Sequence, residues 1–170
     1  MFKPYSDNVI FLDSEFSSLD PYKGEVLSIG LVKLNGDELY LELEYTGPVD
    51  PWVSEHIIPD LKAPKISRPE AVVRITEFVG AQKPYIITYV TPYDVIYIRK
   101  LFGSEASPFF WLPVDFSSIL FGYGIDPEAY YLGDKKNFFK DIGIDTSKYR
   151  EHHALDDARL LREVYLKMSA

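Results

Sequence analysis

Residues 8–16, "NVIFLDSEF", read as a β-strand in which an apolar run ends in two acidic side chains. The run "VIFL" at residues 9–12 favours a central strand over an edge strand with two solvated acids. Asp13 and Glu15 are two residues apart, so their side chains leave the same face of this strand. Two carboxylates this close cannot both stay ionised in a dry site without a compensating cation. Because Mg²⁺ prefers oxygen ligands, the stretch predicts a metal site at the end of a central strand.

The rest of the chain predicts an α/β fold around that strand. "Asn35-Gly36" is a strong hairpin signal between two runs with strand character, and "GPVDPW" (47–52) is interpreted as a connection. Three antiparallel strands followed by alternating helices and strands predict a mixed sheet in a single domain, residues 1–170. The expected strands are 8–16, 24–34, 37–45 and 84–90, the expected helices are 68–80, 92–103, 135–144 and 152–168, and 109–124 is expected to be a short strand leading into a helix.

Composition limits the classes of function. The net charge of −8 argues against a broad basic surface that clamps duplex nucleic acid through many phosphate contacts. The absence of cysteine excludes disulfides and thiolate metal sites. The first residues, "MFKPYSDNVI", lack the pattern of a signal peptide, and no apolar run approaches the length of a membrane span. We therefore expect a cytoplasmic protein with no membrane partner.

A third acid lies in "TPYDVIYIRKLFG" (91–103). Asp94 follows a buried strand and stands near the start of a helix. Acidic residues also favour helix N-termini for electrostatic reasons alone, so Asp94 is either a helix-start residue or a further metal ligand.

The stretch "HHALDDARLL" (152–161) supplies a histidine and a fourth acid. Asp157 lies near the apolar side of the predicted helix, where an unpaired carboxylate would be costly. His152 precedes it by five positions, and a neutral histidine can act as a general base near physiological pH. His153 and Asp156 stay open as alternatives if the helix starts elsewhere. Four carboxylates and a histidine are typical of a site in which two metal ions straddle a scissile phosphate.

These residues resemble the motifs of the DEDDh family of 3′–5′ exonucleases. Asp13 and Glu15 in "FLDSEF" are similar to its first motif, Asp94 to its second, and His152 with Asp157 to its third. The stretches "PWVSEHIIPDL" (51–61) and "LPVDFSSIL" (112–120) resemble most a branch of small bacterial exoribonuclease-like proteins related to ribonuclease T. The DEDDh resemblance implies a ribonuclease H-like fold, with a mixed five- to six-stranded sheet and helices on both faces.

The resemblance also implies a role for each residue. Asp13 would bridge two Mg²⁺ ions, for which Mn²⁺ substitutes, while Glu15 and Asp157 would hold the ion that carries the attacking water. Asp94 would support the second ion, and His152 would take the proton from the nucleophile. The expected products are 5′-nucleoside monophosphates, released from single-stranded 3′ ends or short oligonucleotides, with RNA favoured over DNA. Members of the family often work as homodimers.

Four further residues are candidates for substrate contact. Ser14 and Phe16 flank the first motif, and an aromatic ring such as that of Phe16 either stacks on the terminal base or packs in the core. His56 and Tyr93 are the other two candidates.

Two other classes of function are alternatives to the exonuclease. A phosphatase with an aspartyl nucleophile needs Asp at the position of Glu15, and its paired acids follow a strand, whereas Asp156 and Asp157 lie inside an amphipathic helix behind a histidine. A catalytically inactive nucleic-acid-binding module on the same fold is the second alternative, although all five motif residues are present.

Overall fold

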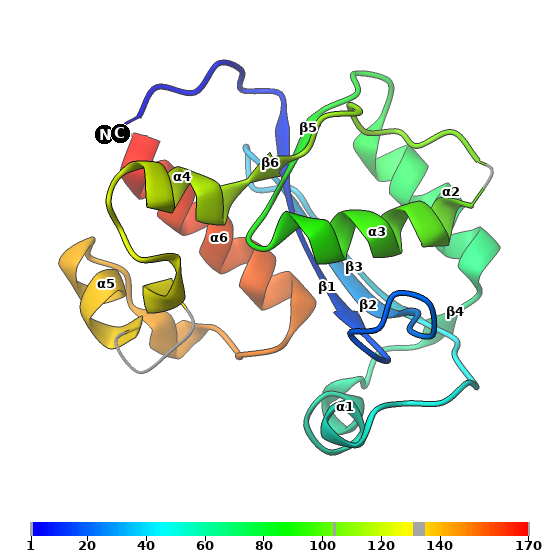
Figure 1. Cartoon of the computed structure of the whole chain (residues 1–170). Coiled ribbons are helices and arrows are strands. Elements are labelled where there is room, and N and C mark those ends of the chain that lie inside the picture. Colours follow the sequence, from blue (N-terminus) through cyan, green and yellow to red (C-terminus); the bar gives the residue numbers. More distant parts are fainter. Residues whose placement is uncertain (1, 104, 131–134, 170) are drawn as a thin grey trace.

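In the computed structural model, which describes residues 2–103, 105–130 and 135–169, a six-stranded sheet runs through the molecule in the order β4-β3-β2-β1-β5-β6 (Figure 1). Strand β1 is antiparallel to β2 and parallel to β5, β2 is antiparallel to β3, and β3–β4 and β5–β6 are parallel pairs. The strands are β1 (Val9–Phe16), β2 (Val26–Lys33), β3 (Glu38–Leu43), β4 (Lys65–Ile66), β5 (Tyr85–Thr88) and β6 (Val114–Asp115).

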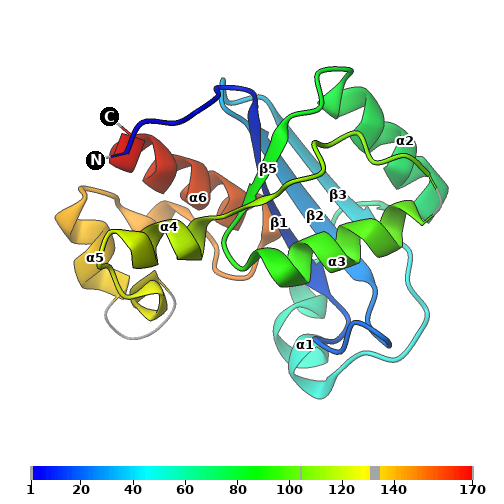
Figure 2. The same cartoon turned by 45° about the horizontal axis from the view of Figure 1, so that its top comes forward.

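Helices cover both faces of the sheet. Residues of α4, α5 and α6 share one hydrophobic core with β1, and residues of α2 and α3 share the other. Figure 2 shows α6 on one side of β1 and β2, with α2 and α3 on the other. The helices are α1 (Pro51–His56), α2 (Arg68–Val79), α3 (Thr91–Phe102), α4 (Phe116–Gly122), α5 (Lys135–Asp141) and α6 (Ala154–Ser169). The predicted mixed sheet with helices on both faces is confirmed.

The alternation along β1 decides which core each side chain joins. Val9 and Phe11 pack into the core beneath α6, while Ile10 and Leu12 pack into the core beneath α2 and α3. Because side chains alternate along a strand, the odd-numbered Asp13 continues the α6 side. The acids therefore emerge where β1 passes beyond its apolar run, next to the start of α6.

A glycine on β2 lets α6 approach the sheet closely at that point. Gly30 pairs with Asp13 across the β1–β2 ladder. A Cβ at Gly30 would overlap the backbone of Ala154 and Leu155, at the start of α6. The missing side chain therefore allows the first turn of α6 to lie directly beside Asp13.

Several short elements were not predicted from the sequence, among them α1 and β4. The stretch 47–52 was interpreted as a connection, but α1 begins inside it at Pro51, where a proline suits the first helical turn. Strand β4 has two residues. Six-residue and two-residue elements are too short to show a hydrophobic period, so neither left a signal. Among the described residues, no helix is long and apolar enough to cross a membrane.

Candidate active site

A cavity of about 530 Å³ opens at the end of β1, between α1, the start of α3 and the segment that leads into α6. Its lining brings together eight of the nine residues singled out from the sequence: Asp13, Ser14, Glu15, Phe16, Tyr93, Asp94, His152 and Asp157. The ninth, His56, is not among the described residues that line it.

Three carboxylates converge in this cavity. Asp13, Glu15 and Asp157 each offer an oxygen, and these oxygens all lie within 4.8 Å of one another. The first two come from β1, and the third comes from the first turn of α6. Asp157 is held there because its carboxylate accepts the backbone N–H of His153 at 3.1 Å.

The fourth carboxylate, Asp94, reaches the site from α3. It is buried, and its Oδ1 accepts the Ser14 hydroxyl at 2.6 Å. Ser14 is itself only 5% exposed. Its hydroxyl therefore holds the Asp94 carboxylate beside the cluster, and Ser14 also lines the cavity.

The electrostatics of the cluster favour protons or a cation. Burial, together with repulsion from Asp157, Asp94 and Glu15, raises the pKa of Asp13 well above its usual range. Burial, with repulsion from Asp94, raises the pKa of Glu15 to about 7. Burial and the Glu15 charge raise the pKa of Asp157 to about 8, and burial raises the pKa of Asp94 to about 7. A set of oxygen donors that repel one another in this way fits a hard divalent cation, which would replace the protons.

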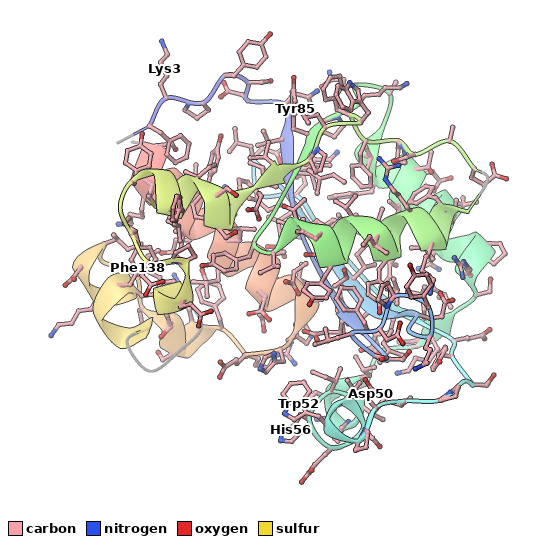
Figure 3. All side chains as sticks on the ribbon, viewed as in Figure 1. Lys3, Asp50, Trp52, His56, Tyr85 and Phe138 are labelled. Atoms are coloured by element: carbon pink, nitrogen blue, oxygen red, sulfur yellow. The ribbon has the colours of Figure 1, made fainter. Side chains whose placement is uncertain are left out.

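His152 lies at the rim of the same cavity. It is exposed, and its backbone has a φ of +57°, in the left-handed region that few non-glycine residues adopt. Its ring meets the edge of Trp52 with centroids 5.1 Å apart and an interplanar angle of 85°. The indole of Trp52 also stacks on His56 at 4.7 Å. Figure 3 shows Asp50, Trp52 and His56 together at α1.

The second histidine of the pair points elsewhere. The His153 ring is 7% exposed and stacks on Tyr40 of β3 at 4.6 Å, and its Nε2 lies 2.8 Å from an Nη2 of Arg150. Burial, with the Arg150 guanidinium, lowers the pKa of His153. Asp156 bonds Arg150 and Arg159. Neither His153 nor Asp156 is among the described residues that line the cavity, which leaves His152 and Asp157 there.

The candidates for substrate contact differ in what their side chains do. Phe16 lines the cavity but stacks on Tyr97 with centroids 3.9 Å apart, and Tyr93 is 41% exposed. Two exposed residues that also line the cavity were not predicted from the sequence: Trp52 (49% exposed) and Leu19 (62% exposed). Trp52 lies in the stretch interpreted as a connection, so a large aromatic residue directly after Pro51 was the available signal.

Comparison with known proteins identifies solved structures that share the fold of this chain. No family model matches the chain, and no curated protein matches it. The zinc-bound complex of Escherichia coli exonuclease I with single-stranded DNA matches with a TM-score of 0.69 and 16% identity, over 92% of this chain and 39% of that one. The same enzyme with a dT13 oligonucleotide matches with a TM-score of 0.70 and 17% identity, over 94% and 40%.

An exonuclease I from Methylocaldum szegediense matches with a TM-score of 0.66 and 17% identity, over 94% of this chain and 40% of that one. This chain therefore spans about two fifths of the length of the exonuclease I chains. At this level of identity the likeness shows a shared fold, and the ribonuclease H-like fold expected from the sequence is confirmed.

Proposed function

We propose that this protein is a metal-dependent 3′–5′ exonuclease that acts on single-stranded nucleic acid. The observation that carries the proposal is the convergence of oxygens from Asp13, Glu15 and Asp157 within 4.8 Å, in a cavity that also holds Asp94 and His152. The shared fold with exonuclease I supports a nuclease.

The carboxylates would hold the metal. Asp13, Glu15 and Asp157 form the nearest set of donors, and Asp94 stands beside them. We infer two Mg²⁺ ions, with Mn²⁺ as a substitute. Bound divalent cations supply charge stabilisation at the phosphoryl oxygens and lower the pKa of water.

Two side chains outside the carboxylate set have roles in the reaction: His152 transfers a proton, and Ser14 orients Asp94. His152 accepts a proton from the water that attacks the terminal phosphorus. The bond from phosphorus to the 3′ oxygen of the preceding nucleotide breaks, that oxygen takes a proton from solvent, and a 5′-nucleoside monophosphate is released. Ser14 keeps the Asp94 carboxylate oriented through its 2.6 Å hydrogen bond.

The substrate is a free 3′ end or a short oligonucleotide. A cavity of about 530 Å³ has the size of a small-molecule pocket, which supports a terminal nucleotide as its occupant. RNA is favoured over DNA on the resemblance to ribonuclease T-like proteins, although the exonuclease I structures hold single-stranded DNA. A homodimer stays an expectation from the family resemblance, and a cytoplasmic location stays a prediction from the sequence. The mass of the protein in solution tests the first.

One experiment tests the function. A 5′-labelled single-stranded RNA and its DNA twin are incubated with the protein in Mg²⁺, in Mn²⁺ or in chelator, and the products are separated by length. We expect stepwise shortening from the 3′ end that requires the cation, with RNA shortened faster. Asp13→Ala removes a central donor and abolishes shortening. Shortening that persists in Asp13→Ala would contradict the assignment, and a faster reaction on DNA would contradict the RNA preference.

Two control measurements distinguish the exonuclease from the phosphatase and from the inactive binding module. Hydrolysis of p-nitrophenyl phosphate without shortening of oligonucleotides would indicate the phosphatase. Cation-dependent binding of oligonucleotides without any hydrolysis would indicate the inactive binding module.

A further inference from the structure

The backbone of His152 has an uncommon, left-handed conformation. Of the described non-glycine residues, only His152 and Lys83 have a positive φ, and His152 stands at the cavity rim, two residues before the start of α6 at Ala154. The left-handed region is sparsely populated by residues with a Cβ, and such a conformation persists only when its surroundings hold it. The neighbouring residue supplies those surroundings.

The ring of His153 is fixed on two sides. One face stacks on Tyr40 with centroids 4.6 Å apart and planes inclined by 28°. At its edge, the Nε2 lies 2.8 Å from Nη2 of Arg150. A guanidinium has only N–H groups to offer, so the Nε2 accepts this hydrogen bond and has no lone pair left for a proton from water.

Tyr40 is itself held by contacts along β3 and to the edge strand β4. Its hydroxyl donates to Oε1 of Glu42 at 2.9 Å, and Glu42 is 2% exposed. The other oxygen of Glu42 accepts a hydrogen bond from the Lys65 ammonium of β4. A chain of contacts therefore runs from Lys65 through Glu42 and Tyr40 to His153.

The backbone of His153 forms two hydrogen bonds with Asp157, one of the carboxylates of the cluster. Its N–H donates to the Asp157 carboxylate at 3.1 Å, and its carbonyl accepts the Asp157 N–H at 3.0 Å. The peptide that carries this N–H joins residue 153 to His152. Fixing the ring of His153 therefore fixes the direction in which His152 leaves the chain.

We propose that His153 is a positioning residue that holds His152 in its left-handed conformation at the cavity rim. Tyr40 and Arg150 hold the ring of His153, and we call these contacts the clamp. His153 in turn orients His152, the proposed general base. This inference rests on the proposed function, because the base that it positions is the one assigned there.

A double-mutant cycle tests the clamp. His153→Ala, His152→Ala and the double variant are compared with the wild type in the rate of oligonucleotide shortening. We expect His153→Ala to lower kcat by up to about 10²-fold, the usual cost of a misplaced catalytic group, with a much smaller change in KM. In the His152→Ala background the same substitution has little further effect, because its target is gone. Losses that multiply in the double variant would overturn the proposal.

Conservative variants separate the clamp from general stability. His153→Phe keeps the stacking on Tyr40 and should restore part of the kcat that His153→Ala loses. Tyr40→Phe also keeps this stacking but loses the hydrogen bond to Glu42. Met168→Ala removes a buried side chain at the far end of α6 and reports stability loss alone. We expect it to lower the melting temperature but to leave kcat of the folded protein unchanged. A kcat loss in Met168→Ala equal to that in His153→Ala would contradict the clamp.

A readout without turnover keeps the two proposals distinguishable. In a crystal structure of the His153→Ala variant, we expect His152 to leave the left-handed region and its ring to leave the cavity rim. An unchanged His152 would overturn the clamp. Absence of oligonucleotide shortening by the wild type would instead contradict the proposed function alone, and the crystal structure would still decide on the clamp.

Discussion

At the scale of single residues, the carboxylate cluster provides ligands for a cation but lowers the stability of the metal-free protein. Asp13, Glu15 and Asp157 are drawn together by β1 and α6, and burial raises the pKa of each. A buried acid whose pKa is raised is more stable in the folded chain when it is protonated. Removing one of these charges should therefore stabilise the metal-free protein while removing a ligand.

Asp157→Asn tests that trade-off. An amide at this position resembles the protonated acid, and its oxygen can still accept the His153 N–H. We expect a higher melting temperature in chelator at pH 8, by about 2–4 °C for each kcal/mol gained in a domain of this size. Binding of Mn²⁺, measured by calorimetry, should be lost. A lower melting temperature together with intact Mn²⁺ binding would contradict the placement of Asp157 in the cluster.

Trp52 provides a second prediction for a single residue. Its half-exposed indole lines the cavity, and stacking of a base on an aromatic ring accepts any base. Trp52→Ala should raise KM for oligonucleotides by about tenfold, consistent with the usual value of one base–aromatic stack. Trp111→Ala is the matched control, because this second tryptophan is 71% exposed and lies outside the lining of that cavity. Equal effects of the two substitutions would contradict a stacking role for Trp52.

At the scale of elements, the site depends on how closely α6 approaches the sheet. The ladder between β1 and β2 places Gly30 opposite Asp13, and the start of α6 lies against that glycine. The same helix buries its apolar side beneath the sheet through Ala158, Leu161 and Val164. Packing of one helix on two strands therefore sets the separation of Asp13 and Asp157.

Gly30→Ala tests this packing. The added methyl group would overlap the backbone at Ala154 and Leu155, so α6 must shift. We expect destabilisation of about 1–3 kcal/mol in chemical denaturation, the usual cost of overpacking, together with weaker Mn²⁺ binding. Gly122→Ala in α4 is the control, since no atom lies within 4 Å of its added Cβ. Gly30→Ala with unchanged stability and Mn²⁺ affinity would contradict the close approach of α6.

At the scale of the whole molecule, the cluster makes stability depend on pH. The folded-state pKa values of Glu15, Asp94 and Asp157 are raised to between about 7 and 8, so between pH 4 and pH 8 these three groups bind more protons in the folded chain than in the unfolded chain. The stabilisation from these groups is complete below their unfolded pKa values and is lost as the pH rises through the folded values. Without a cation, the protein should be less stable at pH 8 than at pH 5.

Thermal melts with and without a divalent cation check this expectation. In chelator, the melting temperature should fall between pH 5 and pH 8. Added Mn²⁺ should raise it more at pH 8, because at pH 5 protons compete for the same oxygens. The Asp157→Asn variant should show a smaller fall with pH. A metal-free melting temperature that rises steadily up to pH 8 would contradict the shifted pKa values.

Much of this architecture follows from local sequence. The alternation in "VIFL" assigns Val9 and Phe11 to one core and Ile10 and Leu12 to the other, and the same period places Asp13 and Glu15 together. Gly80 and Gly103, both with positive φ, end α2 and α3 within one residue of the predicted ends. Helix α1 was missed because six residues show no period, and the prediction for His56 did not anticipate that its ring packs on Trp52.

The sequence by itself determined the layers of the fold and the identity of the acids, because periodicity and glycine signals act over a few neighbouring residues. It left open which residues of "HHALDD" face the cavity. That choice depended on Tyr40, more than a hundred positions away, which stacks on His153. Only the tertiary structure brought Asp13 and Asp157 within reach of one ion, since that distance depends on the packing of α6 against Gly30.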